Sequence, residues 1–367
     1  MESKTRMLPL DPDTLEARAQ ERLPRMVFDY YAGGAEDEVT LRANRAAYRR
    51  LGLRPRVLTD VGAIDTSLDL LGHHLRHPIL LAPTAFQRLA HPDGELAVAR
   101  AAKRAGAVYV ASTLSTCTIE EIAAEAPGLL WFQLYVFRDR ALSRDIIARA
   151  EAAGATALCL TVTVPVQGRR ERDARNGFRL PAELEMANFR GCLQVALPAA
   201  NGSGLEAFIG RNFDPSLEWD VLDWIRSVTR LPLLIKGILG GEDAVRAVEN
   251  GADGIIVSNH GGRQLDGALP TVVVLPEVVD AVAGSVPVLV DGGIRRGSDV
   301  LKALALGAAA TLIGRSYLWG LALAGEEGVF TVLEDRREEL VRAMALTGRT
   351  RLEQLDRSLI LEVPWTG

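Results

Sequence analysis

The stretch SNHGGRQLDG places a histidine, an arginine and an aspartate directly after the apolar run GADGIIV. His260 is suited to accept a proton, because imidazole titrates near pH ~6.5. Arg263 follows three residues later, and a planar guanidinium can hold a carboxylate through two parallel hydrogen bonds. Tyr135 ends another apolar run, Arg169 and Arg170 follow a third, and all three could join the same site. Together these residues predict a base beside a carboxylate clamp.

A second group of residues is suited to bind a phosphate. DGGIRRG, residues 291–297, leads into a helix-like segment, and IGR follows one unit later at residues 313–315. Glycines let the backbone approach an anion closely, and the N–H groups at the start of a helix face it. Arg295 and Arg315 add positive charge. The alternative is a pair of tight turns with surface arginines.

Lys236 is the one charged residue in the apolar run PLLIKGI. A buried lysine needs a negative partner, because an unpaired ammonium is costly to remove from water. It could form a Schiff base or lie beside an electron-rich cofactor ring. Ser112, Gln133 and Thr161 end other apolar runs and could hydrogen-bond a flat heterocycle, which favours the cofactor.

The elements that must position these residues repeat along the chain. The apolar runs are PILLAPTA (78–85), AVYVAS (107–112), LLWFQLY (129–135), ALCLTV (157–162), PLLIKGI (232–238), GIIVSN (254–259), VPVLVDGG (286–293) and TLIGR (311–315). Helical stretches rich in Ala, Glu and Arg separate them, and several of these stretches close with Gly106, Gly154 or Gly307. Apolar strands alternating with helices indicate a parallel sheet, and eight such units predict a closed (β/α)8 TIM barrel with its site at the C-terminal strand ends. An open dinucleotide-binding sheet would favour G-x-G-x-x-G after the first strand, where this chain has Ala-Pro-Thr-Ala.

The chain is predicted to form a single domain with two additions to the barrel at residues 78–367. Residues 1–77 are expected to form a helical cap over one barrel mouth, with helices at 10–24 and 38–51 joined by FDYYAGGAED. The region of about 171–218 carries three prolines and the tetrapeptide NGSG between the fourth and fifth strands. Because long loops in compact domains are usually functional or disordered, we expect a mobile flap over the site.

Composition and charge exclude several classes of partner. The formal net charge of −5 argues against nucleic acid and anionic membranes. No apolar run approaches the ~20 residues of a membrane span. The N-terminal residues lack the apolar core of a signal peptide. We therefore expect a soluble protein that binds neither nucleic acid nor a membrane.

The cysteines and histidines predict neither disulfides nor metal. Cys117, Cys159 and Cys192 are widely spaced and odd in number, which favours a reduced, cytoplasmic location. A metal site would need carboxylate or cysteine neighbours in a defined geometry, which the histidines near the first strand lack. These histidines are His73, His74, His77 and His91.

Together the motifs resemble the FMN-dependent α-hydroxy-acid oxidase and dehydrogenase family, which includes glycolate oxidase, lactate oxidase, mandelate dehydrogenase and hydroxymandelate oxidase. The similarity covers nearly the whole chain, and SNHGGRQLDG is its most specific motif. The resemblance implies FMN at the barrel mouth, oxidation of a 2-hydroxy acid to a 2-oxo acid, and commonly a homotetramer. The other matching segments are DYYAGGAEDEVTLRAN, PILLAPTA, FQLY, GRRERD, LLIKGI, VDGGIRRGSDVLKALALGA and IGR.

The resemblance also implies roles for single residues. His260 is the catalytic base, Arg170 and Arg263 bind the substrate carboxylate, and Tyr30 and Tyr135 bind substrate oxygens. The implied cofactor ligands are Pro83, Thr84 and Ala85 against one face of the flavin; Ser112, Gln133, Thr161 and Lys236 at its ring edge; Ser258 at the ribityl chain; and Asp291, Gly292, Gly293, Arg295, Gly314 and Arg315 at the ribityl chain and phosphate. The resemblance leaves open whether the proton comes from the α-carbon or from the hydroxyl.

Thr163 departs from the family pattern. Family oxidases usually carry LTVD after the fourth strand, and that aspartate orients the histidine, whereas this chain has LTVT. A hydroxyl can accept a hydrogen bond but carries no charge to stabilise an imidazolium. We therefore expect a weaker base or a different proton path, unless another carboxylate such as Asp266 compensates.

Leu114 is the second departure, because glycolate-type enzymes carry tryptophan at this point. Loss of the indole opens space over the substrate side chain, which favours a bulky or aryl acid such as mandelate. RERDARNGF is also similar to mandelate-oxidising members. Residues 182–214 lack an apolar insertion for a membrane quinone, and Ala85 resembles the alanine of oxidases, so molecular oxygen is the expected acceptor.

Alternatives to this interpretation stay open. A dehydrogenase of the same family would use another electron acceptor. A barrel made inactive by Thr163 would bind FMN without oxidising an acid. An IMP dehydrogenase-like barrel would need a nucleophilic cysteine on a flexible loop, which none of the three cysteines fits. A barrel like type 2 isopentenyl-diphosphate isomerase would need metal and diphosphate ligands in place of the carboxylate clamp.

Overall fold

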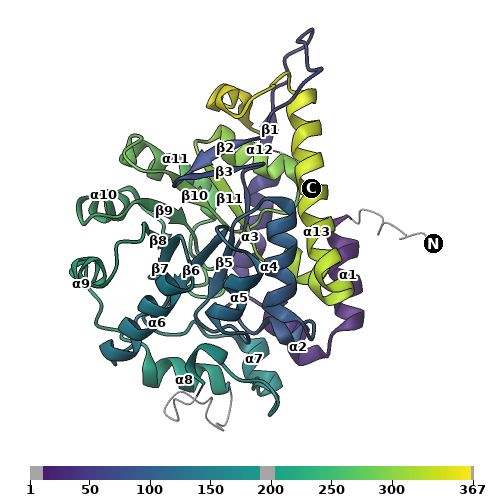
Figure 1. Cartoon of the computed structure of the whole chain (residues 1–367). Helices are drawn as coiled ribbons and strands as arrows, with labels where there is room; N and C mark the ends of the chain where they lie inside the picture. The colour runs from purple at the N-terminus through teal and green to yellow at the C-terminus, as the bar shows by residue number, and fades with distance from the viewer. Residues whose placement is uncertain (1–10, 191–202, 365–367) are drawn as a thin grey trace.

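The computed structural model describes residues 11–190 and 203–364. Within them, eight parallel strands close into a barrel in the order β4, β5, β6, β7, β8, β9, β10 and β11, and β11 pairs back with β4 (Figure 1). The predicted (β/α)8 TIM barrel is confirmed. The strands are β4 (Ile79–Leu81), β5 (Tyr109–Ser112), β6 (Leu130–Leu134), β7 (Ala157–Thr161), β8 (Leu233–Ile238), β9 (Gly254–Val257), β10 (Val288–Val290) and β11 (Ala310–Ile313).

Helices around the barrel begin and end at the expected signals. At the start of α5 the Thr118 hydroxyl accepts from the backbone N–H of Glu121, while the Glu121 carboxylate accepts from the N–H of Thr118. Gly106 ends α4 in the left-handed conformation (φ 68°), as predicted. These helices are α4 (Gly94–Ala105), α5 (Ile119–Glu125), α6 (Arg140–Ala152), α9 (Val221–Val228), α10 (Gly241–Glu249), α11 (Thr271–Val282), α12 (Gly297–Ala305) and α13 (Arg315–Leu346), with η1 (Gln87–Leu89) after β4.

A small hairpin closes the N-terminal end of the barrel. It pairs β2 (Leu68–Leu70) with β3 (His73–Leu75), and Leu70 and Leu75 pack against the side chains that fill the barrel interior. His73 Nε2 lies 2.9 Å from Oγ1 of Thr156, which directly precedes β7. The interior is therefore a packed core, and only the C-terminal end is left for a ligand.

The N-terminal cap contains a helix that the sequence analysis missed. The cap helices are α1 (Pro12–Arg22), α2 (Arg25–Ala32) and α3 (Val39–Arg49). The expectation that FDYYAGGAED only joins two helices is wrong, because its first five residues belong to α2 and bury Phe28, Tyr30 and Tyr31. The glycine signal that suggested a connector takes effect only at Gly33, where α2 ends.

The C-terminal residues of the described chain return to this cap. β12 (Ile360–Glu362) pairs antiparallel with β1 (Leu51–Leu53), and two short 3-10 turns, η4 (Leu352–Gln354) and η5 (Arg357–Leu359), precede it. The described parts of the chain contain no helix that is long and apolar enough to cross a membrane.

The region predicted as a mobile flap contains ordered helices in its described parts. These elements are α7 (Glu171–Asn176), η2 (Ala187–Phe189) and α8 (Gly204–Asn212), whereas residues 191–202 lie outside the described residues. Phe178, Phe208 and Phe213 are buried and anchor the region to the core. The prolines suggested irregular structure because they separate helices too short to show a clear period.

Candidate active site

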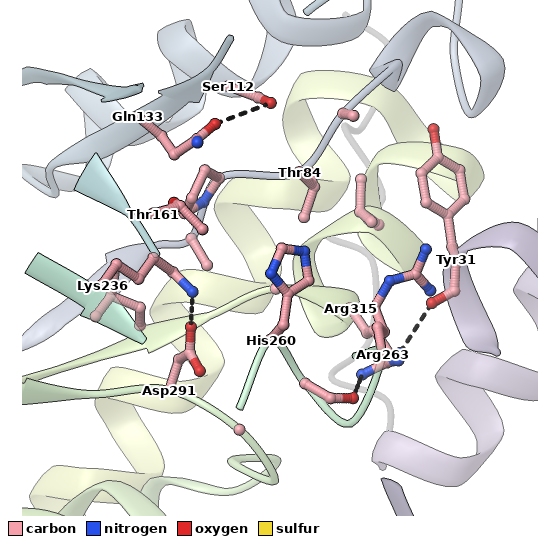
Figure 2. A pocket seen from close by; sticks show the side chains of 18 of the residues that line it. Tyr31, Thr84, Ser112, Gln133, Thr161, Lys236, His260, Arg263, Asp291 and Arg315 are labelled. Carbon is pink, nitrogen blue, oxygen red and sulfur yellow. Dashed lines mark hydrogen bonds and ion pairs between the residues drawn. The ribbon is translucent and has the colours of Figure 1, made fainter. Parts of the chain in front are cut away.

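The C-terminal ends of the barrel strands surround a cavity that contains the predicted site (Figure 2). Every predicted catalytic, substrate or cofactor residue lines it except Ser258. The lining residues predicted from the sequence are Tyr30, Pro83, Thr84, Ala85, Ser112, Leu114, Gln133, Tyr135, Thr161, Arg170, Lys236, His260, Arg263, Asp291, Gly292, Gly293, Arg295, Gly314 and Arg315.

Several lining residues were not predicted. Val164, Leu205 and Ile209 add an apolar wall to the cavity. Leu205 and Ile209 are four residues apart on α8, a spacing that places them on one helix face and could have marked them. Tyr31 also lines the cavity, directly after the predicted Tyr30.

Lys236 has the negative partner that its burial requires. Its Nζ lies 2.6 Å from Oδ2 of Asp291 and donates to Ser258 Oγ at 2.8 Å. A β-bulge follows Lys236, where Gly237 takes a φ of 126° and the register with β9 shifts. Ser258 is fully buried and also accepts from the His260 N–H at 3.1 Å. Ser258 therefore contacts two site residues, and its role as a ribityl ligand stays a prediction.

Several buried polar atoms in the cavity wall lack partners among the described residues. Gln133 Oε1 accepts from the Thr113 N–H at 3.2 Å and from Ser112 Oγ at 3.4 Å, but Gln133 Nε2 has no partner. The same holds for Thr161 Oγ1, Asp291 Oδ1 and Arg295 Nε. Burying polar atoms without partners is costly, so this mixture of donors and acceptors fits a polar heterocycle such as the isoalloxazine ring with its ribityl chain.

The opposite end of the cavity is suited to a phosphate. Gly292 and Gly293 have φ values of 93° and 83°, and a Cβ on Gly293 would lie 2.2 Å from the backbone O of Asn44. Burial, followed by the charges of Arg263 and Arg295, lowers the pKa of Arg315 well below its usual value. Guanidinium groups held in such a position favour a bound anion, so the residues fit the phosphate of FMN.

The C-terminal end of α2 holds two of the site arginines. Arg263 Nη1 donates to the backbone O of Tyr30 and of Gly33, at 2.6 and 2.8 Å. Arg315 Nε donates to Tyr31 O at 2.8 Å (Figure 2). Arg315 Nη2 donates to Gly33 O at 2.9 Å. Carbonyl groups at the end of a helix carry partial negative charge, so the helix that the sequence analysis missed orients both guanidinium groups.

His260 lies at the centre of the cavity, between the Lys236–Asp291 pair and the arginines (Figure 2). Its backbone is in the left-handed region (φ 58°). The preceding residue, Asn259, is fixed by two hydrogen bonds of 2.8 and 2.9 Å between its side-chain amide and that of Asn44. Burial lowers the pKa of His260 well below its usual value, and the nearby charges of Lys236 and Arg170 lower it further. The imidazole is therefore neutral and able to accept a proton at neutral pH.

Thr163 is the hydrogen-bond partner of His260, as its position in the sequence predicted. Its Oγ1 lies 2.9 Å from His260 Nδ1. The idea that Asp266 compensates is wrong, because the Asp266 carboxylate accepts from the N–H groups of Val39 and Thr40 at 3.1 and 2.8 Å at the start of α3. His260 is thus oriented by a neutral hydroxyl.

Of the two arginines after the fourth barrel strand, only Arg170 enters the site. Arg170 is buried and donates to the backbone O of Arg263 at 3.4 Å and to Gln264 Oε1 at 3.3 Å. Arg169 points outward, with a side chain 77% exposed and an ion pair of 2.9 Å to Glu171. Gln264 Nε2 also donates to the backbone O of Thr163 at 2.8 Å, so one amide holds this loop in place.

The tyrosines of the site are neutral and supported by aromatic neighbours. The Tyr30 ring stacks on Phe178 with centroids 4.2 Å apart, and the Tyr135 ring lies 4.5 Å from that of Phe213. Burial raises the pKa of both Tyr30 and Tyr135. Both hydroxyls therefore keep their protons and can donate to a ligand oxygen.

The described residues show no chemistry of the rival barrels. They contain no group of three or more His, Cys, Asp or Glu side chains placed to hold a metal ion. Cys117 and Cys159 are buried, and burial raises the pKa of each thiol to about 12, which makes both unreactive. Cys192 lies outside the described residues.

Comparison with known proteins identifies the family. The sequence profile of the FMN-dependent dehydrogenases matches residues 19–362. The chain is 52% identical to an L-lactate oxidase of Nostoc sp., over 96% of this chain and 98% of that protein. It is 50% identical to glycolate oxidase 3 of Arabidopsis thaliana, over 94% of each. A crystal structure of mandelate oxidase with (S)-4-hydroxymandelic acid superposes with a TM-score of 0.92 at 47% identity, over 96% of this chain and 98% of that one.

The chain belongs to the FMN-dependent dehydrogenase family. It is an FMN-dependent oxidoreductase, and its relatives include oxidases of 2-hydroxy acids. The predicted family, cofactor and enzyme class are confirmed.

Replacing Thr163 by Asp should raise the pKa of His260, because a carboxylate beside Nδ1 favours the imidazolium. The neutral imidazole is the base, so the acid limb of the pH profile of flavin reduction should move upward by about 1 unit or more. Above that limb, the stronger base should reduce the flavin faster. Stopped-flow mixing under anaerobic conditions at a series of pH values measures both effects.

Thr163→Ser is the matched control, since it keeps the hydroxyl and should retain the profile of the unaltered protein. If Thr163→Asp changes neither the profile nor the rate, the hydroxyl at this position does not limit the base.

Proposed function

We propose that the chain oxidises a bulky or aryl 2-hydroxy acid to the 2-oxo acid, with molecular oxygen as the electron acceptor and hydrogen peroxide as its product. The observation that carries this proposal is the neutral imidazole of His260, in one cavity with two buried arginines and two neutral tyrosines. FMN supplies the acceptor for the two electrons that leave the substrate. The two protons of the hydroxy acid balance those in hydrogen peroxide.

The charged and neutral side chains of the site have different roles. Arg263 and Arg170 bind the substrate carboxylate. The N–H groups of Arg263 that do not donate to α2 are available for this carboxylate. His260 takes the proton, since its Nδ1 is bound to Thr163 and Nε2 is left for the substrate. The Tyr135 hydroxyl donates to a substrate oxygen. This division holds whether the proton leaves the hydroxyl or the α-carbon.

An apolar wall supports a bulky substrate. Leu114 is only 4% exposed and lines the cavity with Val164, Leu205 and Ile209. Such a wall suits a phenyl ring or a long aliphatic chain better than the single hydrogen of glycolate. The mandelate oxidase that superposes on this chain binds (S)-4-hydroxymandelic acid in its crystal structure.

Molecular oxygen is the acceptor that the relatives support, because they are named oxidases of lactate, glycolate and mandelate. The described part of the flap includes an exposed ion pair of 2.6 Å between Arg190 and Glu185. A dehydrogenase that uses another acceptor is the alternative. The cytoplasmic location and the homotetramer stay predictions.

A substrate panel tests the proposed reaction. The purified FMN-bound protein, mixed anaerobically with mandelate, long-chain 2-hydroxy acids, lactate and glycolate, should lose its yellow absorbance fastest with mandelate or a long-chain acid. Admission of oxygen should restore the absorbance and yield one hydrogen peroxide per 2-oxo acid.

Leu114→Trp should lower kcat/KM for mandelate by about tenfold or more, because an indole fills the space of the phenyl ring.

Three results of the panel would contradict the proposal. Absorbance that no acid bleaches would indicate a barrel that only binds FMN. Bleached protein that oxygen fails to restore would indicate a dehydrogenase. Faster turnover of glycolate than of mandelate would refute the bulky substrate.

Arg263→Lys should raise the KM of the best acid by about tenfold or more, because an ammonium cannot replace a guanidinium that binds a carboxylate through two hydrogen bonds. Steady-state kinetics measure this change. Arg169→Lys is the matched control, because Arg169 directly precedes Arg170 but points outward, and its exposed side chain predicts an unchanged KM. Equal KM values for the two variants would show that Arg263 does not bind the substrate carboxylate.

A further inference from the structure

Residues 82–86 cross one wall of the cavity after β4, and Ala82, Thr84 and Ala85 line it. The backbone N–H groups at the two ends of this segment are fixed by Ile313 O and Leu114 O. Between those ends, side chains hold its carbonyl groups. Tyr317 Oη donates to Ala82 O at 2.8 Å, Gln87 Nε2 to Thr84 O at 3.2 Å, and Tyr31 Oη to Phe86 O at 2.6 Å.

Tyr317 has a second contact in this cluster, with the Thr84 hydroxyl. A carbonyl oxygen can only accept, so the single hydrogen of Tyr317 goes to Ala82 O. The Thr84 hydroxyl must then donate to Tyr317 Oη. Tyr317 is fully buried, and burial raises its pKa, so the phenol stays neutral and keeps this arrangement.

Gln87 completes the arrangement from the other side. Its Nε2 lies 3.0 Å from Thr84 Oγ1 and 3.1 Å from Tyr317 Oη. Because the Thr84 hydroxyl donates to Tyr317 Oη, its hydrogen is directed away from the cavity. The Thr84 side chain can offer the cofactor only a lone pair.

We propose that Tyr317 is a positioning residue that keeps the Thr84 hydroxyl hydrogen away from the FMN ring and so limits how readily the ring takes up negative charge. Tyr317 does not line the cavity, so it acts only through Ala82 and Thr84. Without its hydroxyl, the Thr84 hydrogen is free to turn toward the cavity and donate to a ring that has gained negative charge. The inference concerns the cofactor and holds for any acid substrate.

Sulfite tests this proposal, because it adds to the oxidised flavin ring, places negative charge on it and bleaches its absorbance. Titration of the FMN-bound protein with sulfite should give a Kd about tenfold lower in Tyr317→Phe, the size of one hydrogen bond to a charged group. The Kd of FMN itself should change less than about threefold, since the residues at the phosphate end are untouched.

Tyr109→Phe is the matched control. Tyr109 is equally buried, and its hydroxyl accepts from Gln87 Nε2 at 2.9 Å, but this hydroxyl forms no hydrogen bond with residues 82–86 in the described structure. Its sulfite Kd should stay within about twofold of that of the unaltered protein. In a Thr84→Val background, where there is no hydroxyl to turn, Tyr317→Phe should likewise have no effect on the sulfite Kd.

Three results would overturn the proposal: an unchanged or higher sulfite Kd in Tyr317→Phe, the same decrease in Tyr109→Phe, or an undiminished decrease in the Thr84→Val background. The absorbance spectrum and FMN content of each variant show that it folds and binds the cofactor. A Tyr317→Phe protein that cannot retain FMN would also overturn the proposal, because it would show that the tyrosine holds the fold instead of tuning the ring.

Discussion

Buried positive charge at the barrel mouth is the constraint on which the rest of the site depends. The cationic groups that line the cavity are Lys236, Arg170, Arg263, Arg295 and Arg315. Burial lowers the pKa of Arg263 to about 10 and also lowers that of Arg295. Asp291 pairs with Lys236, Asp173 lies 4.0 Å from Arg170, and backbone carbonyls accept from Arg263 and Arg315. Such a cavity favours anions, and a phosphate with a carboxylate substrate supplies them.

The same positive charge explains the state of His260. An imidazolium next to these groups would be repelled, so the histidine is neutral before the reaction but gains a proton against this repulsion. A family oxidase with an aspartate beside the histidine can stabilise the charged form after proton transfer. Here Thr163 takes that place, so the proton taken from the substrate has less electrostatic support. Stabilisation of the imidazolium therefore depends more strongly on the anions bound in the cavity.

Much of the site could be predicted because its residues follow apolar strands. The barrel period places Gln133, Thr161 and Lys236 at strand ends, and parallel strands bring their ends to one mouth. The outward direction of Arg169 and the inward direction of Arg170 could not be predicted, because they depend on the path of a loop held by Gln264. The assignment of Ser258 to the cofactor stays a prediction, and in this structure its hydroxyl accepts from Lys236.

The least predictable element is α2, because its eight residues, RMVFDYYA, are too few to show a sustained helical period. Its carbonyl groups orient Arg263 and Arg315, and its tyrosines line the cavity. Side-chain amides of Asn44 and Asn259 join the cap to the loop of His260 across 215 residues of sequence. Tertiary contacts of this range leave no local signal in the sequence.

The most direct test compares the binding of FMN and riboflavin to the protein stripped of cofactor, measured by quenching of flavin fluorescence. Riboflavin has the same ring and ribityl chain but lacks the phosphate. If the buried arginines require an anion, FMN should bind at least about 100-fold more tightly, and the difference should fall when Arg315 is replaced by Met. Equal affinity for the two flavins would contradict the account.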